Sequence, residues 1–87
     1  MGQAPEMERE MNTRQDMDRA RAQIEAEIRQ LAADRDYKAQ RLERLRAHTA
    51  LPGCEARAER AKARYKAEIS EINRRIGMLE ANLEGLA

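Results

Sequence analysis

The chain has 87 residues, enough for one small domain, and its 17 basic residues nearly balance 16 acidic ones, for a formal net charge of +1. Leu, Ile, Val and Phe supply only 12 of the 87 residues, and Val, Phe and Trp are absent, which excludes a sandwich, a barrel or a buried parallel sheet. Ala, Glu, Lys, Leu and Arg account for 52 residues. This composition is typical of long helices and coiled coils when a helical period is present.

The N-terminal end is polar, and we expect residues 1–12 to form a flexible tail. Thr13 followed by Asp16 resembles a capping box, in which a hydroxyl and a carboxylate bind the free N–H groups of a helix start. The chain then continues without Gly or Pro as far as His48. The sequence therefore predicts a first helix over residues 13–48.

The helical pattern is interrupted at Pro52 and Gly53, which predict a turn over residues 49–53. A second helix is expected over residues 54–84. Gly85 then resembles a C-terminal stop, because glycine readily adopts the left-handed conformation that ends many helices.

Apolar residues recur at spacings of three and four along both expected helices, a pattern that predicts a coiled-coil seam. Because the turn is short, the helices should be antiparallel neighbours, with residues facing each other when their numbers add up to about 100–103. The expected seam residues are Met17, Ile24, Ile28, Leu31, Leu42, Leu45, Tyr65, Ile69, Ile72, Ile76, Leu79 and Leu83. The predicted fold class is therefore all-α, an antiparallel two-helix hairpin of coiled-coil type.

One layer of this seam is polar, since Arg35 and Lys38 occupy seam positions. The expected pairing places them beside Tyr65 and Glu68. A cation over the tyrosine ring or a salt bridge would satisfy the layer.

A two-helix hairpin buries only one stripe of each helix, which is little apolar contact for the chain entropy lost. We therefore expect a homodimer that forms an elongated four-helix bundle. A row of small residues behind the seam provides a possible second face, although Ala is also simply the best helix former. This row consists of Ala56, Ala63, Ala67, Ser70, Gly77 and Ala81.

No motif for chemistry is present: there is no phosphate-binding loop, no paired-Cys zinc pattern and no nucleophile elbow. With His48 and Cys54 as the only His and Cys, we expect no catalytic, cofactor or metal site and a protein that is not an enzyme. Cys54 near a helix start, with Arg57 one turn away, can be interpreted as a redox-sensitive thiol. A tolerated surface cysteine is the preferred interpretation.

A single cysteine allows no internal disulfide, which suggests a reducing cytoplasm as the location. No run of 18 apolar residues occurs, so no membrane partner is expected. Arg outnumbers Lys 14 to 3 and Ala is abundant. This bias suggests a bacterial or phage origin.

The charges are unevenly distributed along the chain. Residues 35–66, the half of the hairpin next to the turn, hold ten positive and four negative side chains, a balance of +6. The remaining residues hold seven positive and twelve negative side chains, a balance of −5. The hairpin should therefore have a basic tip and an acidic open end.

A basic tip has three interpretations: it docks on an acidic protein surface, it contacts nucleic-acid phosphates, or it is a solvated surface without a partner. The nucleic-acid interpretation has little support, because Tyr37 and Tyr65 are the only aromatic residues. We expect a small regulator, inhibitor or adaptor that binds a host protein through its helix faces and tip. A nucleic-acid-binding dimer and a structural or assembly subunit are the alternatives. The expected partner-contacting residues are Arg41, Arg44, Arg57, Arg60 and Arg64, with Leu51 as an apolar anchor.

Overall fold

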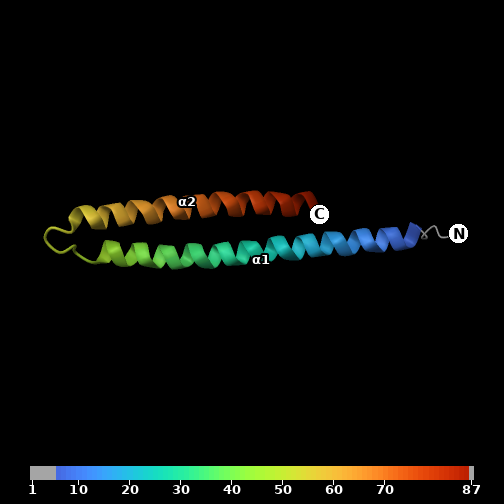
Figure 1. Cartoon of the computed structure of the whole chain (residues 1–87), viewed down its shortest axis with the longest axis horizontal. Coiled ribbons are helices and arrows are strands. Elements are labelled where there is room, and N and C mark those ends of the chain that lie inside the picture. The colour runs from blue at the N-terminus through green and yellow to red at the C-terminus, as the bar shows by residue number, and fades with distance from the viewer. Residues whose placement is uncertain (1–5, 87) are drawn as a thin grey trace.

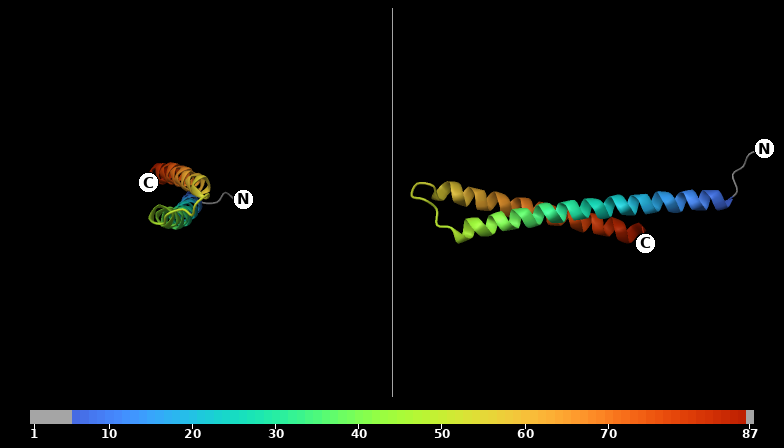
Figure 2. Two further views of the ribbon diagram at one scale, coloured as in Figure 1. Left: turned by 90° about the vertical axis from the view of Figure 1, so that its left-hand side faces the viewer. Right: turned by 90° about the horizontal axis from the view of Figure 1, so that it is seen from below.

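Two long helices joined by one loop make up the computed structural model, which describes the backbone of residues 6–86 and the side chains of residues 13–86. Helix α1 covers Glu6–Ala47 and helix α2 covers Glu55–Leu86. They run antiparallel in a rod of 80 × 19 × 15 Å, in which α1 extends well past the end of α2 (Figure 1). Viewed from a second side, α2 passes across α1 along the length of the rod (Figure 2). The predicted antiparallel two-helix hairpin is confirmed.

The N-terminal end of α1 differs from the sequence-based expectation. The helix begins at Glu6 and not at residue 13, so residues 6–12 of the expected tail are helical and residues 1–5 lie outside the described part. The Glu, Met and Arg residues of this stretch are strong helix formers, and they extend the helix through the cap-like signal at Thr13.

The C-terminal end of α2 also differs, because the helix continues through Gly85 to Leu86. Among the described residues, only Gly53 has a positive φ, so the left-handed stop expected at Gly85 is wrong. The backbone carbonyl of Leu86 accepts a hydrogen bond from Nη2 of Arg21 at 3.3 Å. This contact holds the last turn of α2 against α1.

The loop is built around a type II turn. The backbone N–H of Cys54 donates to the carbonyl of Leu51 at 2.9 Å, and Gly53 at the third position has a φ of 88°. A type II turn favours Pro at its second position and needs a residue that tolerates positive φ at its third, which explains the Pro52-Gly53 pair. The N–H of Gly53 also donates to Oε2 of Glu55 at 2.9 Å, which ties the turn to the first residue of α2.

The register of the hairpin is shifted from the expected one. Four polar contacts cross between the helices: Arg21 with Leu86, Arg35 with Asn73, Lys38 with Glu68, and Arg75 with Glu27. The first three join residues whose numbers add up to 106–108, and only the fourth, at 102, lies in the expected range. Figure 1 shows the reason for the larger sums: the loop carries the chain past the end of α1, so α2 begins farther out than α1 ends.

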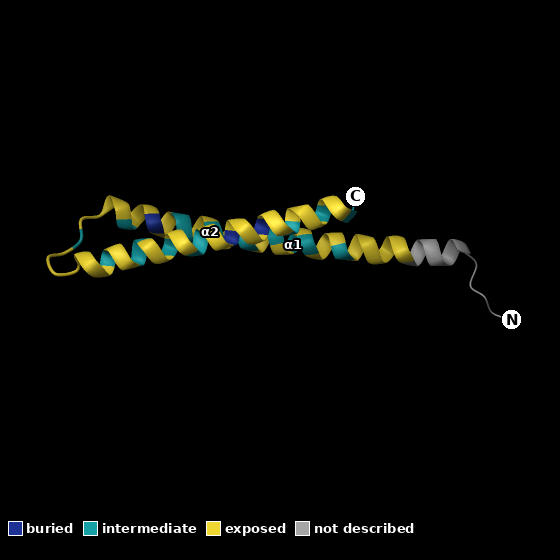
Figure 3. Cartoon of the chain, turned by 90° about the horizontal axis from the view of Figure 1, so that it is seen from above, coloured by how far each residue is buried: buried dark blue, intermediate teal, exposed yellow. Residues whose placement is uncertain are grey.

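The seam is narrow. Leu42, Ile72 and Ile76 are the buried residues, at 7%, 6% and 7% exposure, and no described side chain is completely buried. Eight other seam residues are half-buried: Ile24, Ile28, Leu31, Leu45, Tyr65, Ile69, Leu79 and Leu83. Figure 3 shows these positions along the facing sides of the helices, with exposed residues elsewhere. The hairpin is therefore held by a single apolar stripe.

Met17, also expected in the seam, is 40% exposed. Leu86 ends α2 beside Arg21, so Met17 lies about one helical turn past the last residue that α2 offers. The row of small residues on α2 is exposed throughout, at Ala56, Ala63, Ala67, Ser70, Gly77 and Ala81.

Shortening a buried seam residue should destabilise the hairpin, whereas shortening an exposed one should not. We expect Ile76→Ala to lower the free energy of unfolding by about 2–4 kcal/mol, because it removes buried methyl groups and leaves a cavity. Met78→Ala, at a side chain that is 64% exposed, should change it by less than about 0.5 kcal/mol. Urea unfolding followed by circular dichroism at one protein concentration measures both, and equal losses would contradict the observed burial.

The two glycines Gly53 and Gly77 should respond oppositely to substitution by alanine. Gly53→Ala forces a Cβ into left-handed backbone and should destabilise the protein by about 1–2 kcal/mol. At Gly77, an added Cβ would meet nothing within 4 Å, so Gly77→Ala should stabilise it by up to about 1 kcal/mol. Thermal unfolding should show the melting temperature falling in the first variant and rising in the second.

Candidate functional site

The basic tip contains cations of three kinds, which differ in their contacts. Five are within ion-pair distance of carboxylates: Arg35 with Asp36, Lys38 with Asp34 and Glu68, Arg46 with Glu43, Lys62 with Glu59, and Arg64 with Glu68. The guanidinium of Arg41 lies 5.5 Å from the ring centroid of Tyr37, a cation–π contact within α1. Arg44, Arg57, Arg60 and Lys66 are exposed and have no ion-pair partner among the described residues.

The sequence explains why these four cations are free. On a helix, ion pairs form between residues three or four positions apart. At these spacings, none of the four has an Asp or Glu on its own helix: Arg57 and Arg60, for example, are flanked mainly by Ala and Arg. No carboxylate at these spacings therefore neutralises their charge.

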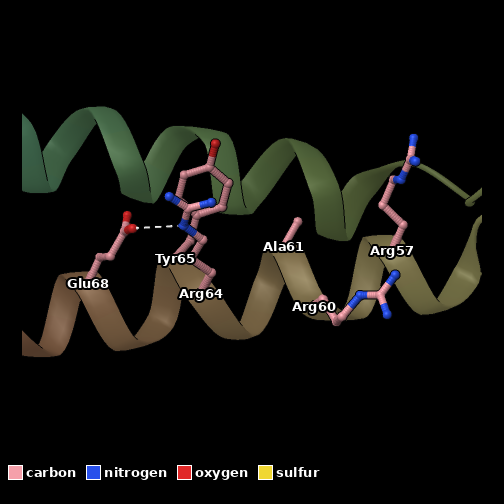
Figure 4. A pocket seen from close by; sticks show the side chains of 6 residues that line it. All are labelled: Arg57, Arg60, Ala61, Arg64, Tyr65 and Glu68. Atoms are coloured by element: carbon pink, nitrogen blue, oxygen red, sulfur yellow. Dashed lines mark hydrogen bonds and ion pairs between the residues drawn. The ribbon is translucent and has the colours of Figure 1, made fainter.

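Two grooves lie at the tip and adjoin each other. The first, of about 570 Å³, is lined by Arg57, Arg60, Ala61, Arg64, Tyr65 and Glu68 (Figure 4). The second, of about 390 Å³, is lined by Arg41, Arg44, Leu45, His48, Ala61 and Tyr65. Since Ala61 and Tyr65 line both, we treat the two as one surface and call it the basic groove.

The basic groove has an apolar floor between two rows of cations. Arg41 and Arg44 come from α1 and Arg57, Arg60 and Arg64 from α2, while His48 lies directly after the last residue of α1. The floor consists of Leu45, Ala61 and Tyr65, all half-buried. In Figure 4, Ala61 and Tyr65 point toward α1, while Arg64 reaches along α2 to Glu68.

The register of the hairpin creates this space. Leu45 and Ala61 line the same groove, which places a large residue of α1 near a small residue of α2. Because Ala61 ends at Cβ, it occupies little of the space beside Leu45. Its small side chain thus helps to open the groove.

A polar layer borders the groove on the side away from the loop. Nζ of Lys38 lies 3.1 Å from Oδ2 of Asp34 and 3.4 Å from Oε2 of Glu68. The hydrogen bond to Asp34, helped by the charges of both carboxylates, raises the pKa of Lys38 above its ordinary value, although partial desolvation opposes the rise. Glu68 also accepts a hydrogen bond from Nε of Arg64 at 3.1 Å, so one carboxylate links α1 to the arginine row of α2.

Of the expected polar layer, the part at Lys38 forms as expected and the part at Arg35 does not. Of the two expected solutions, Lys38 forms the salt bridge, to Glu68. Arg35 instead donates from Nη1 to Oδ1 of Asn73 at 3.1 Å. The aromatic ring that receives a cation is Tyr37, and the cation is Arg41 of the same helix. The shifted register accounts for the first difference, because it places Asn73 opposite Arg35. The contact between Arg41 and Tyr37 forms within α1 and does not depend on the register.

The structure places five of the six predicted contact residues on one surface. All five arginines line the basic groove, whereas Leu51 is 74% exposed in the turn and lines neither part of it. From the sequence, Tyr65 is expected in the seam, and neither His48 nor Ala61 is expected on a binding surface. Ala61 could have been identified from its position next to Arg60 at the edge of the seam.

Neither metal binding nor disulfide chemistry has support in the described residues. They contain no cluster of His, Cys, Asp or Glu that could hold a metal ion, and Cys54 is an exposed free thiol. Within residues 6–86, neither helix combines the length and the hydropathy required to cross a bilayer.

Removing the Asp34 carboxylate should shift the titration of Lys38. A raised pKa means that the charged amine stabilises the fold below its ordinary pKa, and that this contribution disappears as the pH rises through the raised value. We expect Asp34→Asn to lower the pKa of Lys38 toward its ordinary value and to reduce the loss of stability at alkaline pH. NMR titration of the Lys38 side chain measures the first effect, and an unchanged pKa would show that Asp34 is not its main partner.

Comparison of the chain with family models, with curated proteins and with solved structures found no match. The basic groove and its charges are the features of the chain that bear on its function.

Proposed function

We propose that the chain is a non-enzymatic protein-interaction module, a small regulator, inhibitor or adaptor that binds an acidic helix of a partner protein in the basic groove. The observation that carries the proposal is the pairing of an apolar floor with free cations on both sides. Arg44 on α1 and Arg57 and Arg60 on α2 have no carboxylate partner among the described residues. An amphipathic helix offers the complementary surface, an apolar stripe flanked by acidic side chains.

The two parts of the groove would contribute differently to binding. Ion pairs at an exposed surface contribute little affinity, so the arginines mainly steer the encounter and set the orientation of the partner. Apolar contact with Leu45, Ala61 and Tyr65 would supply the affinity, because these half-buried side chains lose their remaining water on binding. Binding should therefore slow at high salt without disappearing.

An apolar floor favours a protein partner over nucleic acid. A nucleic-acid surface needs phosphate contacts together with base readout or stacking on aromatic rings. Tyr65 is half-buried, and Tyr37 is 56% exposed with the guanidinium of Arg41 over its ring. The tip thus offers charge with little aromatic surface for bases.

Reversing the free charges should weaken this binding. The probe is a fluorescent peptide of about five helical turns with leucines at helical spacing and glutamates elsewhere, measured by fluorescence anisotropy. We expect Arg57→Glu/Arg60→Glu to raise the dissociation constant at least about tenfold, because two attractive charges become repulsive.

The matched control is Arg29→Glu/Lys66→Glu, which makes the same change in net charge at exposed residues that line no part of the basic groove. It should leave the dissociation constant within about twofold. An equal loss in both variants would reduce the proposal to a net-charge effect. Tighter binding of a duplex DNA of similar length than of the peptide would favour the nucleic-acid alternative.

A further inference from the structure

Within the described residues, α2 does not extend beside the end of α1 that lies opposite the tip. Helix α1 has 42 residues and α2 has 32, and Leu86 ends α2 beside Arg21 (Figure 1). Residues 6–18 therefore project past the hairpin, and we call them the overhang. By sequence, the overhang holds five acidic residues and two arginines. Its length is roughly 20 Å, close to the roughly 17 Å of α2 between Arg57 and Glu68 in the basic groove.

The described part of the overhang has the side-chain pattern that the groove requires. Asp16, Met17 and Asp18 are exposed, and neither aspartate has an ion-pair partner among the described residues. Successive residues of a helix point about 100° apart, so the two aspartates leave the helix on either side of Met17. An apolar side chain flanked by two carboxylates matches an apolar floor flanked by two rows of cations.

We infer that the overhang of a second copy of this chain occupies the basic groove. Met17 of that copy would lie on the floor formed by Ala61 and Tyr65. Asp16 and Asp18 would each face one row of arginines, from α1 or α2. The inference rests on the proposed function, since it assigns a partner to the same groove.

The positions of groove and overhang at opposite ends of the rod define the arrangement. Two copies that lie side by side and antiparallel place each overhang in the groove of the other, related by one two-fold axis. Both sites are then used, and the association closes at two copies. The rods overlap along their whole length.

The exposed surface of the single chain agrees with this arrangement. The chain exposes 7368 Å². A compact protein of 10.0 kDa exposes roughly 5,200 Å². The excess is of the size that stable homodimers cover at their interfaces. A second copy along the rod would cover much of it.

Light scattering with small-angle X-ray scattering tests the arrangement directly. We expect a mass of about 20 kDa, twice that of the chain, with a longest dimension still near 80 Å. A longest dimension near 160 Å would indicate end-to-end contact and overturn the side-by-side geometry. A mass near 10 kDa would overturn the inference itself.

Charge reversal identifies the contact. Arg57→Glu/Arg60→Glu reverses the groove and Asp16→Arg/Asp18→Arg reverses the overhang, so each variant alone should be a helical monomer by light scattering and circular dichroism. Mixing the two variants should restore the mass of the dimer. The reversed groove of one variant then meets the reversed overhang of the other, and the native groove of the second meets the native overhang of the first. The Arg29→Glu/Lys66→Glu control should remain a dimer. A mixture that stays monomeric would contradict the pairing of groove and overhang.

The acidic peptide separates this inference from the proposed function. Asp16→Arg/Asp18→Arg keeps an intact groove without a self-complementary overhang, so it should bind the peptide at least as tightly as the native chain. If the native chain is monomeric and the groove still binds the peptide, the self-association is wrong and the proposed function stands. If neither the peptide nor a second copy binds, both are wrong.

Discussion

The structure depends on the single seam between α1 and α2. Of the residues whose side chains the structure describes, only Leu42, Ile72 and Ile76 are buried in it, and they lie on one apolar stripe. The charged contacts at its edge therefore help to define which residues face each other. Glu68 is the most connected of these, since it joins Lys38 of α1 to Arg64 of α2. The basic groove depends on the register that the loop sets, in which Ala61 lies near Leu45.

The groove and the thin seam are two aspects of one packing pattern. In the middle of the rod, Ile72 and Ile76 are buried between the helices. Near the loop, α2 contributes the small residue Ala61, which lines the basic groove together with the arginines. A larger side chain in place of Ala61 would leave less room for a partner on the apolar floor. Local underpacking costs stability, but it leaves a surface that a partner helix can cover.

Much of this fold follows from the sequence, because a helical period and a Pro-Gly turn are local signals. The register does not follow, because it depends on how the turn from Leu51 to Cys54 directs the chain past the end of α1. The cap-like signal at Thr13 was misleading, since the residues before it are equally strong helix formers. The free arginines were predictable from spacing alone: Arg57 and Arg60 have no acidic residue three or four positions away. The groove that uses them was not, because it requires the register.

The opposite charges of the two ends also give the rod a large electric dipole moment. The backbone dipoles of α1 and α2 run in opposite directions and largely cancel, so the side chains determine it. Balances of +6 near the loop and −5 elsewhere, along a rod of 80 Å, correspond to several hundred debye, against about 3.5 debye for one peptide unit. A molecule with such a dipole rotates in the field of a charged surface before it touches it. The near-zero net charge of one chain therefore coexists with a large dipole, which two antiparallel copies lying side by side would cancel.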